Sequence, residues 1–424
     1  MRFKFLHAAD LHIDSPLRGL ERYAGAPAER IRGATRRAFQ ELVTLCLEEE
    51  VRLLLLAGDL FDGDWQDYST GLFFVSELSR LREAGTAVVW IRGNHDAASR
   101  IRKRLTLPEN VKELGVRRPE SLAFEELGLC VHGQGYASAD VREDLVARYP
   151  RPVAGALNVG LLHTALTGRA GHEPYAPCRV ETLVDRGYDY WALGHVHQRE
   201  VVARSPWIVF PGNLQGRHAR ETGPKGATLV TVDDGRIVDV EARALDVVRW
   251  EVLEVDVSRA GSTTEVLDSV RARVEGAVRG ADGRLLSARV RLTGATDVHR
   301  ALGRDRERLI QEVRAQMLDL ADDEVWLERL ELATEPRAGA AIPHPERNDA
   351  LGQLSLAFSR LRDDPRELEQ LAEELAELRA KLPHELADGP EPLDLGAGTV
   401  KSLLDDVERL VLSRLGGDTP EGSA

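Results

Sequence analysis

The chain is poor in cysteine and has no long apolar run. Its three cysteines, Cys46, Cys130 and Cys178, are far apart in the sequence. They therefore predict no disulfide framework, and we expect them to be buried as small apolar side chains. No apolar stretch is long enough to cross a bilayer, and the apolar residues near the N-terminus are too few for a secretory signal. These absences predict a soluble, cytoplasmic protein without a membrane partner.

An excess of positive charge is also missing. The chain has 56 Lys and Arg against 70 Asp and Glu, which gives a formal net charge of -14. A protein that coats nucleic acid without selection needs a broadly basic surface, so the composition excludes that class. It does not exclude nucleic acid as a substrate, because a metal site and a local basic patch would be enough to hold a polyanion.

Five predicted strands end in polar residues that are almost only of three kinds, Asp, Asn and His. The clearest is the apolar run 53–57, which suits a strand buried on both faces and leads into Gly58 and Asp59. Sheets of α/β proteins bind ligands at the carboxyl ends of their strands, so a carboxylate there faces a crevice. The polar residues that follow the five strands are Asp10 and His12, then Asp59 and Asp62, then Asn94, His95 and Asp96, then His163, and finally His195 and His197.

The spacing within these groups also carries information. Strand side chains alternate with a period of two, so we expect Asp10 and His12 to point to one side and chelate one ion. For the same reason His195 and His197 should face one crevice. Each group alone is weak evidence, because polar residues at strand ends are often turn residues. Five such groups in succession predict a metal centre, with Asp59 at its middle.

The five groups resemble the sequence blocks of the calcineurin-like metallophosphoesterase superfamily. Within it, the chain is most similar to the SbcD-type DNA repair exonucleases, in the bacterial branch labelled YhaO. The likeness covers residues 1–245, and Phe210 and Asn213 stand where these nucleases usually have Tyr and Ser. It implies an α/β (α+β) fold, a four-layer α/β/β/α sandwich, and a metal-dependent phosphodiesterase or exonuclease that acts on DNA.

The resemblance also implies roles for the site residues. Asp10, His12 and His197 would bind one divalent ion, Asn94, His163 and His195 would bind the other, and Asp59 would bridge them. His95 would be a general acid or a stabiliser of the transition state, held by Asp62 or Asp96. Ligands of this mixed oxygen and imidazole type suit manganese or iron, with zinc as a third candidate, better than calcium or magnesium.

Two groups of basic residues are candidates for contacts with the DNA backbone. The first is Arg100, Arg102, Lys103 and Arg104, and the second is Arg217 with His218. Such contacts hold phosphates without reading the base sequence. A solvated helix face is the alternative for the first group.

A chain of 424 residues is too long for one core, so we expect several domains. The short strands 228–232 and 236–240 predict a hairpin that completes a second sheet. A β-α-β-α-β pattern then resembles the family's capping domain, with a generic accessory domain as the alternative. The predicted parts are a nuclease domain at 1–248, an α+β capping domain at 249–333, a linker at 334–348, a helical segment at 349–415 and a disordered tail at 416–424.

The helical segment suggests a partner. Leucines from Leu368 to Leu382 alternate spacings of three and four, which is typical of a coiled-coil-like helix. A second amphipathic helix is predicted from Val400 to Leu415. The two helices could pack on each other or back on the protein. The resemblance implies instead that they bind the coiled coil of an SMC-like ABC ATPase, and it also implies a homodimer.

Two other functions remain open from the sequence. A phosphatase or cyclic-nucleotide phosphodiesterase would use the same metal core with a closed small pocket and no capping domain. A non-catalytic scaffold for the ATPase would have no need of His95.

Overall fold

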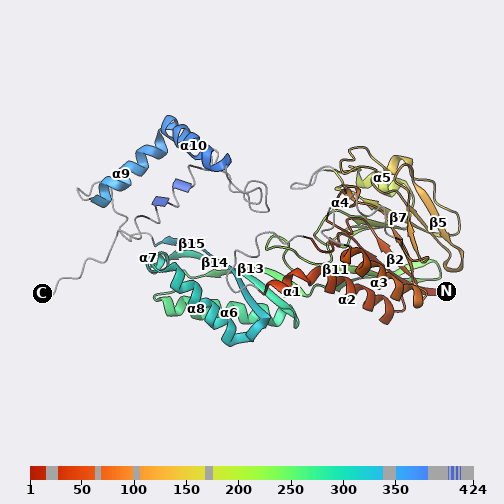
Figure 1. Cartoon of the computed structure of the whole chain (residues 1–424), viewed down its shortest axis with the longest axis horizontal. Helices are drawn as coiled ribbons and strands as arrows, with labels where there is room; N and C mark the ends of the chain where they lie inside the picture. Colours follow the sequence, from red (N-terminus) through yellow and green to blue (C-terminus); the bar gives the residue numbers. More distant parts are fainter. Residues whose placement is uncertain are drawn as a thin grey trace. The chain divides into compact units, whose positions relative to one another are not determined.

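The structure is a computed structural model that describes residues 1–15, 27–62, 68–98, 106–167, 175–337 and 350–380, together with 400, 403–404, 407–408 and 411. The chain divides into two compact units (Figure 1). The described residues of the first unit are 1–15, 27–62, 68–98, 106–167, 175–251 and 283–287. Those of the second unit are 252–282 and the described positions from 288 onward.

The first sheet of the first unit has the strand order β12-β11-β1-β2-β3-β4. Its parallel strands are β1 (Arg2–Ala8), β2 (Leu53–Leu56), β3 (Ala87–Trp90) and β4 (Val111–Glu113). The hairpin of β11 (Gly226–Asp233) and β12 (Arg236–Ala244) adds to β1 in the antiparallel direction. All four leucines of β2 are buried, because a central parallel strand has apolar neighbours on both faces.

The second sheet has the order β5-β6-β7-β8-β10-β9. Its parallel strands are β6 (Leu129–Gly133), β7 (Leu157–His163), β8 (Tyr190–Gly194) and β10 (Trp207–Phe210). The strands β5 (Glu120–Phe124) and β9 (Glu200–Arg204) pair antiparallel at its two edges.

The two sheets pack face to face, with helices on the outside. Leu53 and Leu55 belong to a core that also contains Val159 and Tyr190 of the second sheet. The alternate leucines of β2 face a second core, formed with α2 (Ala34–Glu48) and α3 (Ser69–Glu83). A third core lies on the outer face of the second sheet and includes Leu183 of α5 (Val180–Asp185). These layers confirm the predicted α/β/β/α sandwich, and Cys46, Cys130 and Cys178 are free and buried as expected.

The predicted place of the hairpin is wrong. The sequence suggests that it completes the second sheet, but β11 pairs with β1 of the first sheet over residues 228–233. A hairpin pattern shows only that two strands pair with each other. It does not indicate which free edge of which sheet they extend, because that choice depends on residues far away in the sequence.

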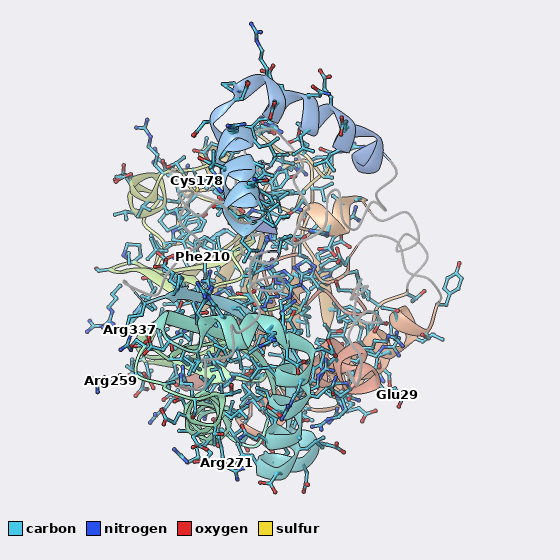
Figure 2. The ribbon with its side chains drawn as sticks, turned by 90° about the vertical axis from the view of Figure 1, so that its left-hand side faces the viewer. Glu29, Cys178, Phe210, Arg259, Arg271 and Arg337 are labelled. Carbon is cyan, nitrogen blue, oxygen red and sulfur yellow. The ribbon has the colours of Figure 1, made fainter. Side chains whose placement is uncertain are left out.

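The second unit contains most of a three-stranded sheet with β14 (Leu285–Thr296) between β13 (Val248–Asp256) and β15 (Val325–Pro336). Its helices are α6 (Thr263–Ala281), α7 (His299–Arg304) and α8 (Arg306–Ala321). Three of the four buried residues of α6, Val266, Val270 and Val274, recur every four positions, which is the pattern of a helix with one apolar face on a core. Arg271, labelled in Figure 2, carries an ion pair from α6 to Asp319 of α8.

Two further helices, α9 (Ala350–Asp363) and α10 (Pro365–Ala380), follow in the chain. Four of the five leucines of the predicted seam lie in α10, whereas Leu382 is outside the described residues, as are 338–349, 381–399 and 412–424. Glu408 accepts a hydrogen bond from Ser355 and forms an ion pair with Arg362, both on α9. None of the helices in the described part of the chain has the length and apolar character needed to cross a membrane.

Candidate metal centre

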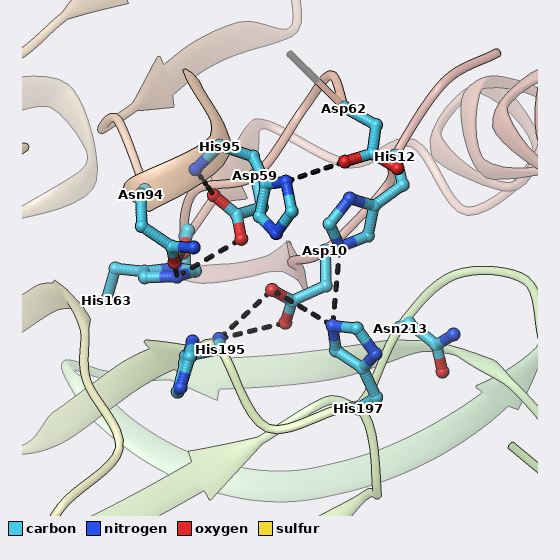
Figure 3. A network of polar contacts seen from close by, with 12 residues as sticks. Asp10, His12, Asp59, Asp62, Asn94, His95, His163, His195, His197 and Asn213 are labelled. Atoms are coloured by element: carbon cyan, nitrogen blue, oxygen red, sulfur yellow. Dashed lines mark hydrogen bonds and ion pairs between the residues drawn. The ribbon is translucent and has the colours of Figure 1, made fainter. Parts of the chain in front are cut away.

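The predicted site residues converge at the carboxyl ends of strands from both sheets (Figure 3). Asp10 and His12 follow β1, and Asp59 and Asp62 follow β2. Asn94, His95 and Asp96 begin the short helix α4 (Asn94–Ala98) after β3. His163 is the last residue of β7, and His195 and His197 follow β8. Face-to-face packing of the two sheets therefore brings together five segments that are distant in the sequence.

The backbone at these positions is not extended. The expectation that strand alternation points Asp10 and His12 to one side is therefore wrong. The φ angles are 52° at Asp10, 44° at His12, 53° at Asp59 and 97° at His195. These lie in the left-handed region, where a non-glycine residue carries strain of about 1–3 kcal/mol. Period-two alternation therefore does not orient the side chains. Tight turns do so, held by hydrogen bonds such as Asp10 N to Gly58 O at 3.0 Å and His12 N to Asp59 O at 3.1 Å.

The first group of possible ligands consists of Asp10, His12 and His197. Their nearest nitrogen and oxygen atoms all lie within 4.8 Å of one another. The Nε2 atoms of His12 and His197 are 3.3 Å apart, and His197 Nε2 is 3.9 Å from Asp10 Oδ1. Two imidazole nitrogens and a carboxylate oxygen that point at one place form a donor set that fits a divalent cation.

The second group consists of Asp59, His163 and His195, with Asn94 beside them. His163 Nδ1 donates to Ala57 O at 2.8 Å, so its Nε2 faces the site. This Nε2 lies 3.1 Å from Asn94 Oδ1 and 3.4 Å from Asp59 Oδ2. Burial alone would lower the pKa of His163, but the charge of Asp59 outweighs it and raises the pKa to about 9. The surroundings of this imidazole therefore favour positive charge, as a metal site requires.

The two groups are directly connected. His195 N donates to both carboxylate oxygens of Asp10, at 3.1 and 2.9 Å, so a residue of the second group holds a residue of the first. Burial opposes ionisation of Asp59, but His163 and His95 hold the pKa of its carboxyl below the usual value. Asp59 is 1% exposed, and its charge is therefore available inside the site.

Gly93 has no side chain because Asp59 occupies the space that one would need. A Cβ atom at Gly93 would lie 2.1 Å from Asp59 Oδ1 and 2.8 Å from the carboxyl carbon. Gly194 also has no space for a side chain, since a Cβ there would lie 2.0 Å from Ala57 O. Both glycines let strand ends approach the site more closely than any other residue would.

We therefore expect Gly93→Ala to displace the Asp59 carboxylate and to weaken metal binding by about 10- to 100-fold, the usual cost of disturbing the support of a ligand. Isothermal titration with Mn²⁺ measures this. The matched control is Gly276→Ala in α6, where an added Cβ meets nothing within 4 Å. Equal Mn²⁺ affinity in both variants would contradict the packing argument.

His95 lies beside the two groups and is held by an acid. Its Nδ1 is 2.6 Å from Asp62 Oδ1, while Asp62 Oδ2 accepts a hydrogen bond from Ser15 Oγ at 2.6 Å. Burial would lower the pKa of His95, but the hydrogen bond and charge of Asp62 outweigh it and raise the pKa. The His95 side chain is 40% exposed, so the ring is open to an incoming molecule.

Asp96, the other acid considered for this role, lies in a different environment. It is 2% exposed and accepts hydrogen bonds from the backbone N–H groups of Leu60, Phe61 and Gly93 at 3.1–3.2 Å. Asp96 therefore ties the turn after β2 to the turn after β3. Of the two alternatives, Asp62 makes the close contact with His95.

The basic residues that were predicted to contact the DNA backbone differ in their surroundings. Arg217 is only 16% exposed, and its guanidinium lies 3.6 Å from Asp62 and 3.1 Å from Glu221. His218 is 35% exposed and lies 3.8 Å from Glu221. Arg100, Arg102, Lys103 and Arg104 are outside the described residues.

Sequence reasoning missed Glu221, which lies next to the first group. Glu221 Oε1 is 2.6 Å from His197 Nδ1, and the residue is 7% exposed. The only sequence signal was an acid four residues after Arg217. That spacing is too common to indicate a site.

Comparisons with known proteins agree with this geometry. Residues 3–199 match the family model "Calcineurin-like phosphoesterase", and residues 250–335 match "Metallophosphoesterase YhaO, middle domain". Over 270 residues the chain is 39% identical to "Uncharacterized metallophosphoesterase YhaO" of Bacillus subtilis (strain 168). The aligned region covers 63% of this chain and 66% of that protein. Over 294 residues it is 28% identical to "DNA double-strand break repair protein Mre11" of Methanopyrus kandleri, which covers 62% of this chain and 59% of that protein.

The chain thus spans less than two thirds of the length of these relatives. Among solved structures, a dimetal phosphatase from Danio rerio is 12% identical with a TM-score of 0.36, covering 57% of this chain and 96% of that one. The family matches and the two sheets with Asp, Asn and His at their strand ends lead to one conclusion. Residues 3–199 belong to the calcineurin-like metallophosphoesterase superfamily, a family of phosphoesterases that use divalent metal ions.

Proposed function

We propose that the chain is a two-metal-dependent DNA phosphodiesterase, an exonuclease that could also nick internal bonds, and that it processes DNA ends in repair. The observation that carries this proposal is the pair of connected ligand groups with His95 open beside them. Two cations bound at such a site would supply a clamp for a phosphodiester and a nucleophile near neutral pH.

Under this proposal Asp10, His12 and His197 would hold one ion, Asn94, His163 and His195 would hold the other, and Asp59 would be shared. The distances within each group support the assignment. Manganese is the expected metal, and iron or zinc would suit the same ligands. Asp62 and Asp96 then serve as supporting acids, one for His95 and one for the turns.

His95 has a separate task. Because Asp62 accepts a hydrogen bond from the Nδ1–H group of His95, the Nε2–H group of the protonated ring is left to donate a proton to the oxygen that departs from phosphorus. The raised pKa keeps the ring protonated to higher pH than an ordinary histidine, which suits a general acid. Arg217 adds positive charge near the same place, and His218 adds a ring nitrogen that can donate a hydrogen bond, for contacts with phosphate oxygens.

DNA is preferred over a small phosphoester for two reasons. Several relatives, among them those of Methanopyrus kandleri and Sulfurisphaera tokodaii, are named as DNA double-strand break repair proteins. The chain also has a second α+β unit, which a phosphatase or cyclic-nucleotide phosphodiesterase with a small closed site would not need. We further propose that the helical segment with α9 and α10 binds the coiled coil of an SMC-like ABC ATPase in the cytoplasm, and that the chain forms a homodimer.

The test uses the purified chain with Mn²⁺ on end-labelled single- and double-stranded DNA, and on bis-p-nitrophenyl phosphate. We expect cleavage of both kinds of substrate that stops when a chelator removes the metal. Cleavage of the generic ester without any cleavage of DNA would favour the small-molecule phosphodiesterase. No cleavage of either substrate, with the metal bound, would favour a scaffold.

A further inference from the structure

We propose that Glu221 is a positioning residue of the metal centre. It fixes the tautomer and orientation of His197, and it holds the guanidinium of Arg217 beside Asp62. The inference deepens the proposed function, because it concerns the same centre and rests on His197 being a ligand. It adds a buried acid from the segment between β10 and β11 to the residues on which the site depends.

The contacts of Glu221 use both of its oxygens. Oε1 is 2.6 Å from His197 Nδ1 and 3.1 Å from Arg217 Nη2. Oε2 accepts hydrogen bonds from Asn213 Nδ2 at 2.9 Å and from Arg217 N at 2.8 Å. The carboxylate is thus held from several directions, and a buried acid held this firmly has a defined orientation.

The first consequence concerns the tautomer of His197. An ionised carboxylate can only accept hydrogen bonds, so the 2.6 Å contact places the proton of His197 on Nδ1. Arg217 Nη2 also lies 3.3 Å from this nitrogen, but it is a donor and cannot share a hydrogen bond with an N–H group. The lone pair is therefore on Nε2, which points toward His12 and Asp10. Histidines that ligate metals commonly donate their other N–H to a carboxylate in this way.

The second consequence concerns Arg217. Its Nη2 is held by Glu221, and its Nη1 lies 3.6 Å from Asp62, the acid that contacts His95. Among the described residues, the buried Nε of Arg217 has no hydrogen-bond partner. Glu221 therefore supports the proposed metal ligand His197 directly. Through Arg217 it also supports the contact between Asp62 and His95.

The direct test is Glu221→Gln, which keeps the shape and removes the charge. An amide cannot replace both acceptor oxygens, and if its NH₂ group turns toward His197, the ring must carry its proton on Nε2. We expect one of the two Mn²⁺ ions to bind about 10- to 100-fold more weakly while the other is little changed. Isothermal titration and the electron paramagnetic resonance signal of the Mn²⁺ pair measure this without any substrate.

The matched control is Glu126→Gln, which removes an exposed acid paired with Arg52 far from the site. It should bind both ions as the original chain does. If Glu221→Gln also binds both ions with unchanged affinity, the positioning role is refuted.

A second measurement needs no variant. Long-range ¹H–¹⁵N correlation spectra of the metal-free chain, labelled in histidine, report which ring nitrogen carries the proton. We expect His197, assigned through a His197→Gln spectrum, to have Nδ1 protonated, and a ring protonated only on Nε2 would overturn the inference. The proposed function fails separately: a chain that binds two Mn²⁺ ions but cuts no DNA would refute the nuclease and leave the role of Glu221 standing.

Discussion

Replacing Asp59 with Asn is expected to weaken both metal sites at once and to lower DNA cleavage by about a thousandfold, because a bound metal supplies several kcal/mol of stabilisation to the transition state. Asp59 is almost fully buried, its pKa is held low, and its oxygens lie among His163 and the backbone of His95. The amide keeps the size of the carboxylate but loses the charge that a shared ligand must supply.

Asp10→Asn is the matched comparison, because Asp10 belongs to the first group only. Mn²⁺ titration of this variant should show one weakened site and one that is nearly unchanged. If both variants lose both sites equally, Asp59 is not a bridge. If Asp59→Asn weakens only one site, it is an ordinary ligand of the second group.

Replacing His95 with Ala is expected to lower kcat on DNA by about 100- to 10,000-fold, which is the usual contribution of a general acid. Both Mn²⁺ ions should still bind, because in our assignment His95 is not a ligand. Steady-state cleavage assays and Mn²⁺ titration of the same preparation separate the two effects. A His95→Ala variant that cut DNA as fast as the original chain would show that the residue has another role.

The choice of leaving group makes this test sharper. p-Nitrophenolate departs easily without a proton, whereas the sugar oxygen of DNA does not. The loss of rate in His95→Ala should therefore be much smaller on bis-p-nitrophenyl phosphate than on DNA. Asp62→Asn, which removes the acceptor at 2.6 Å from His95 Nδ1, should show the same substrate pattern with a smaller loss. An equal loss on both substrates would indicate that His95 acts on binding rather than on the leaving group.

The position of the candidate site could be predicted because the chemistry of metal binding restricts the sequence strongly. Only a few residue types bind such metals, and they must follow buried strands, so Asp59 after four leucines stands out. The helix and strand pattern of the second unit was also accessible, because α6 and α8 repeat their apolar residues every three or four positions. Both signals are local in the sequence.

What could not be predicted depends on contacts between distant residues. The edge chosen by β11, the left-handed turns at Asp10 and His12, and the hydrogen bond from His197 to Glu221 all arise when separate segments meet. Glu221 in particular lies in a segment without regular secondary structure, where no periodicity marks a buried residue. Such supporting acids become recognisable only when the ligand that they hold has been located in space.

The most direct test of the two-metal centre is a crystal structure of the chain soaked in Mn²⁺, with anomalous diffraction to locate the ions. We predict two anomalous peaks about 3.5–4 Å apart, with Asp59 in contact with both. The peak on the first side should lie against His12 and His197, and the other against Asn94 and His163. A single peak, or two ions of which only one touches Asp59, would contradict the account.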